Sequence, residues 1–192
     1  MRLHLAFAAA SLVLIPVFAQ AATYTSNVSD SFPNFSVMGT IQTDLNSGSL
    51  LTADITGYSL TLNDKTQTLT ITPGNSEFAV IGPSALSATA TGLFFNFENT
   101  TLSQFAFQNP ALGAGTNYLC YQGVNSGCDD TDGGAHESIM IGDDPRQLIN
   151  LSGNRQIASA ATTAVAPEPE SLALLGTGML GLFGVARRKL AR

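Results

Sequence analysis

Residues 55–72, ITGYSLTLNDKTQTLTIT, contain two runs in which apolar and polar residues alternate. Successive side chains of a β-strand point to opposite sides, so each run has one apolar face. That face consists of Tyr58, Leu60 and Leu62 from the first run and Leu69 and Ile71 from the second. Asn63 and Asp64 stand between the runs, and both residue types favour turns. The segment predicts a β-hairpin.

The same alternation recurs on both sides of this hairpin. Residues 93–108, LFFNFENTTLSQFAFQ, predict a second hairpin with a polar turn around Asn99. Its inward-facing residues would be Leu93, Phe95, Phe97, Phe105 and Phe107. The runs FSVMGTIQT, from residue 35, and EFAVIG, from residue 77, add further strands. The fold class expected is all-β, an antiparallel β-sandwich or a jelly-roll-like domain.

The first 21 residues have the pattern of a secretory signal peptide. Arg2 precedes an apolar stretch from Leu5 to Phe18, and the small-residue triplet Ala19, Gln20, Ala21 follows. This stretch is short for a membrane span, and an A-x-A triplet is what signal peptidase accepts. We expect a signal helix over 1–21 that is removed, with a retained anchor as the alternative.

The residues after the signal peptide form one acidic domain. Between Ala22 and Ala166 twelve acidic residues face three basic ones, a net charge of −9. A domain without a basic stripe cannot neutralise phosphates, so nucleic-acid binding is not expected. We assign 22–152 to one exported β-rich domain. Residues 153–166, in which Ala is the commonest residue and no aromatic residue occurs, are predicted to be a linker.

The two cysteines lie close together, Cys120 and Cys128 in CYQGVNSGC. A closely spaced pair in an exported chain predicts one local disulfide. The adjoining segment CDDTDGGAHES, from residue 128, supplies carboxylates on a Gly-rich loop, the ligand type that calcium prefers. Its candidate ligands are Asp129, Asp130, Asp132 and Glu137. It lacks acidic residues at the first and last positions of an EF-hand loop, so a solvated acidic loop is the alternative. No other cofactor is expected.

Enzymatic chemistry has little support in the sequence. His136 is the one histidine outside the signal segment, and the chain contains neither G-x-S-x-G nor H-E-x-x-H. A single histidine in a polar loop is more typical of a surface residue than of a general base. We therefore expect a protein that is not an enzyme.

Two binding functions remain open. Threonines alternate along residues 66–72 (Thr66, Thr68, Thr70 and Thr72), and a flat threonine row is a surface that ice-binding proteins present. The simpler interpretation is that this row is the solvent face of a sheet. Glycan binding would suit an exported β-rich domain, although the chain has four tyrosines and no tryptophan for stacking on sugar rings.

The C-terminal segment predicts a transmembrane helix. Residues 171–186 carry no charge, and as a helix they would extend about 24 Å, somewhat less than a hydrocarbon core of about 30 Å. Arg187, Arg188 and Lys189 follow directly. Their side chains can reach the interface, and the positive-inside rule places them in the cytoplasm.

In residues 167–192, Pro167, Glu168 and Pro169 come first, a Gly- and Leu-rich span follows, and the basic cluster comes last. This order of features resembles the PEP-CTERM sorting signal of Gram-negative bacteria. The resemblance implies that an exosortase recognises the Pro-Glu-Pro residues. It also implies a single-pass inner-membrane precursor whose product reaches the cell surface or extracellular matrix. We expect a biofilm- or exopolysaccharide-associated structural or interaction protein, with a glycan- or calcium-binding module as the alternative.

Overall fold

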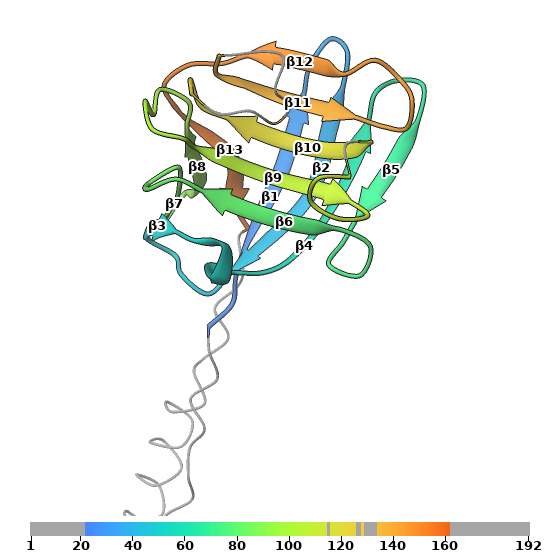
Figure 1. Cartoon of the computed structure of the whole chain (residues 1–192). Coiled ribbons are helices and arrows are strands. Elements are labelled where there is room, and N and C mark those ends of the chain that lie inside the picture. The colour runs from blue at the N-terminus through green and yellow to red at the C-terminus, as the bar shows by residue number, and fades with distance from the viewer. Residues whose placement is uncertain (1–21, 115, 126–127, 129–133, 162–192) are drawn as a thin grey trace, which may run out of the picture. The chain divides into compact units, whose positions relative to one another are not determined.

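The computed structural model describes residues 22–114, 116–125, 128 and 134–161, and this part of the chain is all-β. Its strands form two sheets in which every strand pair is antiparallel (Figure 1). The prediction of an antiparallel all-β fold is therefore confirmed. The signal helix predicted over 1–21 and the membrane helix predicted over 171–186 lie outside the described residues.

One sheet has eight strands and the other has five. The order of the first is β3 (Gly48–Leu50), β7 (Leu86–Thr89), β8 (Gly92–Asn96), β13 (Asn154–Ala160), β1 (Tyr24–Ser31), β2 (Ser36–Thr43), β4 (Ile55–Asn63) and β5 (Thr68–Ile71). The order of the second is β12 (Gln147–Asn150), β11 (His136–Met140), β10 (Asn117–Gln122), β9 (Gln104–Asn109) and β6 (Glu77–Ile81). A short 3-10 helix, Thr52–Asp54, precedes β4. Figure 1 shows the five-stranded sheet in front of β1, β2 and β4.

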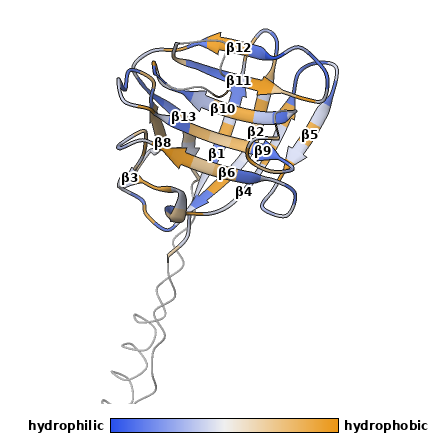
Figure 2. Ribbon diagram, in the orientation of Figure 1, coloured by the Kyte–Doolittle hydropathy of each residue, from blue (hydrophilic) through white to orange (hydrophobic). Residues whose placement is uncertain are grey.

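The core lies between the two sheets and is rich in aromatic rings. Phe107 of β9 lies 4.8 Å from Tyr58 of β4 and 4.6 Å from Phe105, measured between ring centroids. Phe95 of β8 lies 6.1 Å from Tyr121 of β10. The Phe107–Tyr58 and Phe95–Tyr121 contacts join strands of different sheets, and Figure 2 shows apolar residues distributed along the strands of both. Burying such rings is the main favourable term for a sandwich of this kind.

The hairpin predicted over residues 55–72 is confirmed. Strand β4 pairs with β5 in the register Leu60↔Ile71 and Leu62↔Leu69, so the apolar residues share the inner face. The loop between the strands is longer than the Asn63–Asp64 turn that the sequence suggests. It runs from Asp64 to Gln67, and the Asp64 carboxylate accepts hydrogen bonds from the backbone of Thr66 and Gln67.

The hairpin predicted over residues 93–108 is wrong, because its two strands do not pair with each other. The prediction of its buried residues is confirmed. Strands β8 and β9 belong to different sheets: β8 pairs with β7 and β13, and β9 pairs with β6 and β10. The five inward-facing residues predicted there, Leu93, Phe95, Phe97, Phe105 and Phe107, are all buried. The polar segment between the strands crosses from one sheet to the other, and both apolar faces still meet in one core.

The linker predicted over residues 153–166 is wrong for its first half. Residues Asn154–Ala160 form β13, which lies between β1 and β8 inside the larger sheet. Ile157 and Ala158 are buried there, so a segment with a single large apolar residue forms a central strand. The chain divides into two compact units at this point, Met1–Ala160 and Ala161–Arg192.

Candidate functional site

The outer face of β1, β2, β4 and β5 carries no charged side chain. Alternation along each strand places on this face the residues between the buried ones. They are Thr25, Asn27, Ser29, Ser31, Ser36, Met38, Thr40, Gln42, Ser59, Thr61, Asn63, Thr68 and Thr70. All except Met38 have hydroxyl or amide side chains. We call this surface the neutral polar face.

Two of the four threonines in the predicted row, Thr68 and Thr70, lie on this neutral polar face, and Thr66 and Thr72 lie outside strand β5. Thr68 and Thr70 are exposed, as expected for the solvent side of a sheet. Thr70 shares a 3.1 Å hydrogen bond with Thr61 on β4, and the Asn63 amide donates to Thr68 over 3.2 Å. The register continues from Thr61 to Met38 on β2 and to Ser29 on β1. The neighbouring strands therefore continue the row with mixed residue types and do not repeat it as threonine.

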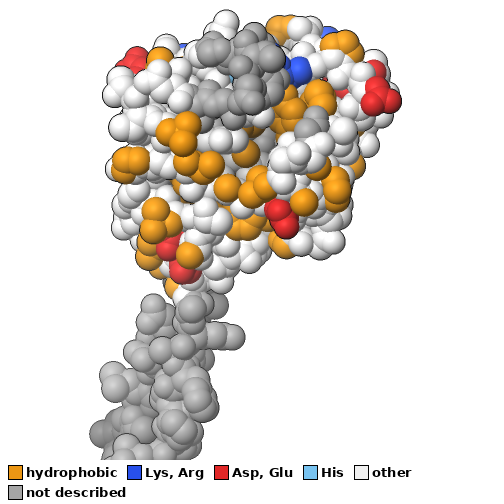
Figure 3. Space-filling model, viewed as in Figure 1, with side chains coloured by type: hydrophobic (Ala, Val, Ile, Leu, Met, Phe, Trp, Pro, Cys, Tyr) orange, Lys and Arg blue, Asp and Glu red, His pale blue; other side chains and the backbone are white. Residues whose placement is uncertain are grey.

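The other sheet presents a different outer face. Figure 3 shows apolar side chains gathered over its strands, with a few acidic groups between them. The exposed apolar residues at its margins include Ile81, Leu102 and Val124. The disulfide lies on this face, where Cys120 and Cys128 pack with Ala106, Tyr118 and Met140.

The predicted disulfide between Cys120 and Cys128 is present. Their Cα atoms are 6.1 Å apart, and the side-chain oxygen of Gln122 accepts a 2.6 Å hydrogen bond from the Cys128 backbone. The disulfide ties the loop that follows β10 back to β10 itself.

Of the four predicted calcium ligands, only Glu137 lies in the described part of the chain. Asp129, Asp130 and Asp132 are outside it. Glu137 is not on a solvated loop. It belongs to β11, is 1% exposed, and shares the inner face of that strand with Ile139 in the core. His136, its neighbour, is buried on the other side of the strand and is not a surface histidine.

Glu137 belongs to a buried acidic cluster that joins the two sheets. Its register partner Tyr121 lies on β10, and the Tyr121 hydroxyl donates to the Asp30 carboxylate of β1 over 3.4 Å. We call Asp30, Tyr121 and Glu137 the inter-sheet acidic cluster. Burial raises the pKa of Asp30 to about 6, although the Tyr121 hydrogen bond opposes the rise. Burial, with the Asp30 charge second, raises the pKa of Glu137 well above its usual range.

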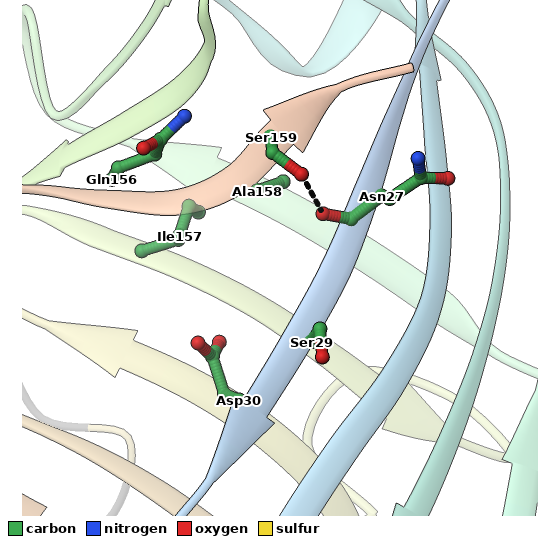
Figure 4. Close-up of a pocket in the computed structure, with 7 residues that line it drawn as sticks. All are labelled: Asn27, Ser29, Asp30, Gln156, Ile157, Ala158 and Ser159. Atoms are coloured by element: carbon green, nitrogen blue, oxygen red, sulfur yellow. Dashed lines mark hydrogen bonds between the residues drawn. The ribbon is translucent and has the colours of Figure 1, made fainter. Parts of the chain in front are cut away.

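A cleft in the larger sheet reaches this cluster. Strands β1 and β13 pair at two positions, Ser26↔Ala160 and Asn27↔Ser159, and β13 has a bulge between Gln156 and Ala158. Figure 4 shows the two strands diverging from the Ser159 end, with Asp30 in the space between them. The resulting pocket has a volume of about 160 Å³ and is lined by residues of β1 and β13.

The inter-sheet acidic cluster was not predicted from the sequence, although the sequence contains a signal for it. Ser26, Val28 and Asp30 alternate with exposed residues along β1, which places an acidic residue on the inner face. Glu137 stands two residues before Ile139, so alternation along β11 places both side chains on the inner face. The sequence therefore contains two carboxylates at inward strand positions, but only the packing of the sheets brings them together.

The comparisons with known proteins concern the C-terminal segment. Residues 165–189 match a family model described as the PEP-CTERM protein-sorting motif, which confirms the resemblance found in the sequence. The match indicates an exported, membrane-associated precursor that an exosortase processes. Searches of the curated proteins and of the solved structures found no match to the chain.

Two further observations concern the described residues alone. No helix among them is long and apolar enough to span a bilayer. No group of three or more His, Cys, Asp or Glu side chains in the same part of the chain is placed to hold a metal ion.

Proposed function

We propose that this protein is a non-enzymatic component of the cell surface or extracellular matrix, which binds neutral exopolysaccharide through the neutral polar face. The observation that carries the proposal is the composition of that face, which has hydroxyl and amide groups and no charge across four adjacent strands. Hydroxyls and amides both donate and accept hydrogen bonds, as sugar hydroxyls do. The acidic remainder of the domain would repel an anionic polymer.

Such binding would be weak at each sugar unit and would depend on repetition. The neutral polar face contains no tyrosine or phenylalanine for stacking on a sugar ring. Its affinity would come from many hydrogen bonds that exchange with water, each contributing little. A long polymer presents the same unit many times, so many protein copies on one matrix can hold it firmly.

The test compares lysine substitutions on the two sheets. Ser59→Lys and Thr70→Lys together place two charges on the neutral polar face, and Ile81→Lys places one on the outer face of the other sheet. We expect the full chain to be retained by a neutral polysaccharide matrix. The double variant should lose most of this retention, and the Ile81 variant should keep it. Retention only by anionic polysaccharide, or equal loss in all variants, would contradict the proposal.

The same proposal includes anchoring by residues 171–186 before processing. Replacing Pro167, Glu168 and Pro169 by alanine should leave membrane insertion intact and trap the uncleaved precursor in the inner membrane. Replacing Arg187, Arg188 and Lys189 by neutral residues should instead weaken anchoring, because the short span loses its interfacial support. Fractionation of tagged protein in a host that has an exosortase measures both. If wild type also remains uncleaved in the inner membrane, a plain one-pass anchor is the better account.

A further inference from the structure

Each of the two sheets ends in strands that pair on one side only, and three of these four edge strands are protected. The Thr52 hydroxyl covers β6, where it accepts a 2.8 Å hydrogen bond from the Val80 amide and donates to the Val80 carbonyl. The Asn75 side chain covers β5, because it bonds the Thr72 amide and the Thr70 carbonyl. Strand β3 has only three residues. Edges blunted in these ways are poor templates for pairing with another strand.

Strand β12 is the fourth edge, and the direction of its backbone groups follows from the register. The Leu151 amide donates to the Ala135 carbonyl. Hydrogen-bonded pairs alternate along an antiparallel ladder, so Ile149 bonds to β11, and Leu148 and Asn150 direct their amides and carbonyls away from it. Within the described part of the chain, no hydrogen bond reaches these outward groups. Figure 1 shows β12 at the margin of the smaller sheet.

The inner side of the same strand is apolar and incompletely covered. Ile149 and Leu151 pack against the core and are only partly buried. A strand added at this edge would cover both, provided that it also directs alternate apolar residues to the inner side. Strand β12 itself has this pattern, and β11 already holds it extended. A second copy of the chain therefore brings a suitable strand without the cost of ordering a flexible peptide.

We propose that β12 pairs antiparallel with β12 of a second copy, about a two-fold axis at Ile149, and so joins two five-stranded sheets into one. The outward positions match in this register, because Leu148 of each copy stands opposite Asn150 of the other. Each such pair exchanges two backbone hydrogen bonds. The axis brings the two Ile149 side chains together on the inner side. A symmetric contact of this kind closes at two subunits.

The arrangement of the dimer follows from its axis. A two-fold axis between antiparallel strands is perpendicular to their sheet, so the two larger sheets lie on the same side of the joined sheet. Their neutral polar faces consequently point in one direction. The inference does not depend on what those faces bind. If polysaccharide is the ligand, two faces on one dimer would hold the polymer more firmly than one.

Cysteine trapping tests the register on the full chain in detergent. The two native cysteines form a disulfide, so an introduced cysteine is the free thiol. Residues opposite each other in a hydrogen-bonded pair have Cα atoms about 5.5 Å apart, within the disulfide range, whereas diagonal neighbours are about 7 to 8 Å apart and outside it. A mixture of differently tagged Leu148→Cys and Asn150→Cys chains should form a cross-linked heterodimer under mild oxidation. Each variant alone should form several-fold less cross-linked dimer.

Proline substitutions test the backbone hydrogen bonds. Leu148→Pro removes an amide that points away from β11, so the domain should stay folded. The dissociation constant of the dimer, measured by sedimentation equilibrium, should rise about tenfold or more. Thr68→Pro is the matched control, because it removes an outward amide from β5 of the other sheet, and it should leave the constant unchanged. Circular dichroism checks folding, and the cysteine variants answer the question if Leu148→Pro is unfolded.

Three results would overturn the proposal. The first is a wild-type chain that stays monomeric up to about 100 μM. The second is a mixture of the two cysteine variants that cross-links no more than each variant alone. The third is a dimer that a folded Leu148→Pro chain forms as tightly as wild type, which would place the contact elsewhere, for example in the predicted membrane segment.

Discussion

Replacing Asp30 by asparagine should stabilise the protein at neutral and alkaline pH. The Asp30 carboxylate is half-buried between the sheets, and burial raises its pKa from 3.8 to about 6, although Tyr121 donates a hydrogen bond to it. An acid whose folded-state pKa is raised favours folding while it is protonated. That contribution is complete below pH 3.8 and is lost as the pH rises through about 6. Asparagine has nearly the same shape and no charge to lose.

The size of the effect follows from the pKa. A rise from 3.8 to about 6 is equivalent to about 3 kcal/mol if the group is fully shielded from solvent. Asp30 is partly accessible from the cleft, so screening reduces the expected difference to about 1 to 2 kcal/mol. The neighbouring Glu137 acts in the same direction, because removing the Asp30 charge also lowers the electrostatic cost of ionising it.

The measurement is denaturant unfolding of wild type and Asp30→Asn, near pH 4 and near pH 8. The variant should be more stable by about 1 to 2 kcal/mol at the higher pH and close to wild type at the lower one. Asp44→Asn serves as the control, since Asp44 is exposed on a loop. A stability difference that does not change with pH, or a variant that is less stable at pH 8, would refute the reasoning.

Three further changes probe the disulfide, a close backbone approach and the core. Reduction of the Cys120–Cys128 bond should lower the free energy of unfolding by about 2 to 3 kcal/mol for so short a loop, and intact mass with and without reductant should show no free thiols before reduction. Gly39→Ala should destabilise by about 2 to 4 kcal/mol, because Gly39 has φ +150° and an added Cβ would lie 2.0 Å from the Ser59 carbonyl oxygen; thermal unfolding measures this loss. Phe107→Ala should cost about 3 to 5 kcal/mol in denaturant unfolding, since Phe107 is fully buried against Tyr58 and Phe105.

The strands and their inward faces were predictable because they depend on local alternation. The segment from Ile55 to Ile71 contains both strands of a hairpin and the turn residues between them, so neighbours in sequence also pair in space. The same alternation identified Phe95 and Phe107 as core residues although they are in different sheets. An inward face depends on which residues are apolar, and this holds whichever strand becomes the neighbour.

Strand pairing at longer range was not predictable in this way. Nothing in the sequence between Phe97 and Ser103 shows that the chain crosses from one sheet to the other there. The apparent linker from Asn154 to Ala160 has few large apolar residues. It nevertheless forms a central strand, because it pairs with β1 on one side and with β8 on the other. Small side chains such as Ala158 fit a crowded central position that a larger residue would fill less well.

The sequence by itself determined the sorting motif, the disulfide and the alternation of strands, because each depends on residues that are close together in the chain. Only the tertiary structure decided that Asp30 and Glu137, more than a hundred positions apart, belong to one inter-sheet acidic cluster. It alone also decided that β1, β2, β4 and β5 lie side by side and present the neutral polar face. Such groupings arise when distant strands pack, because the gain from burying apolar surface selects a sheet order that local patterns do not encode.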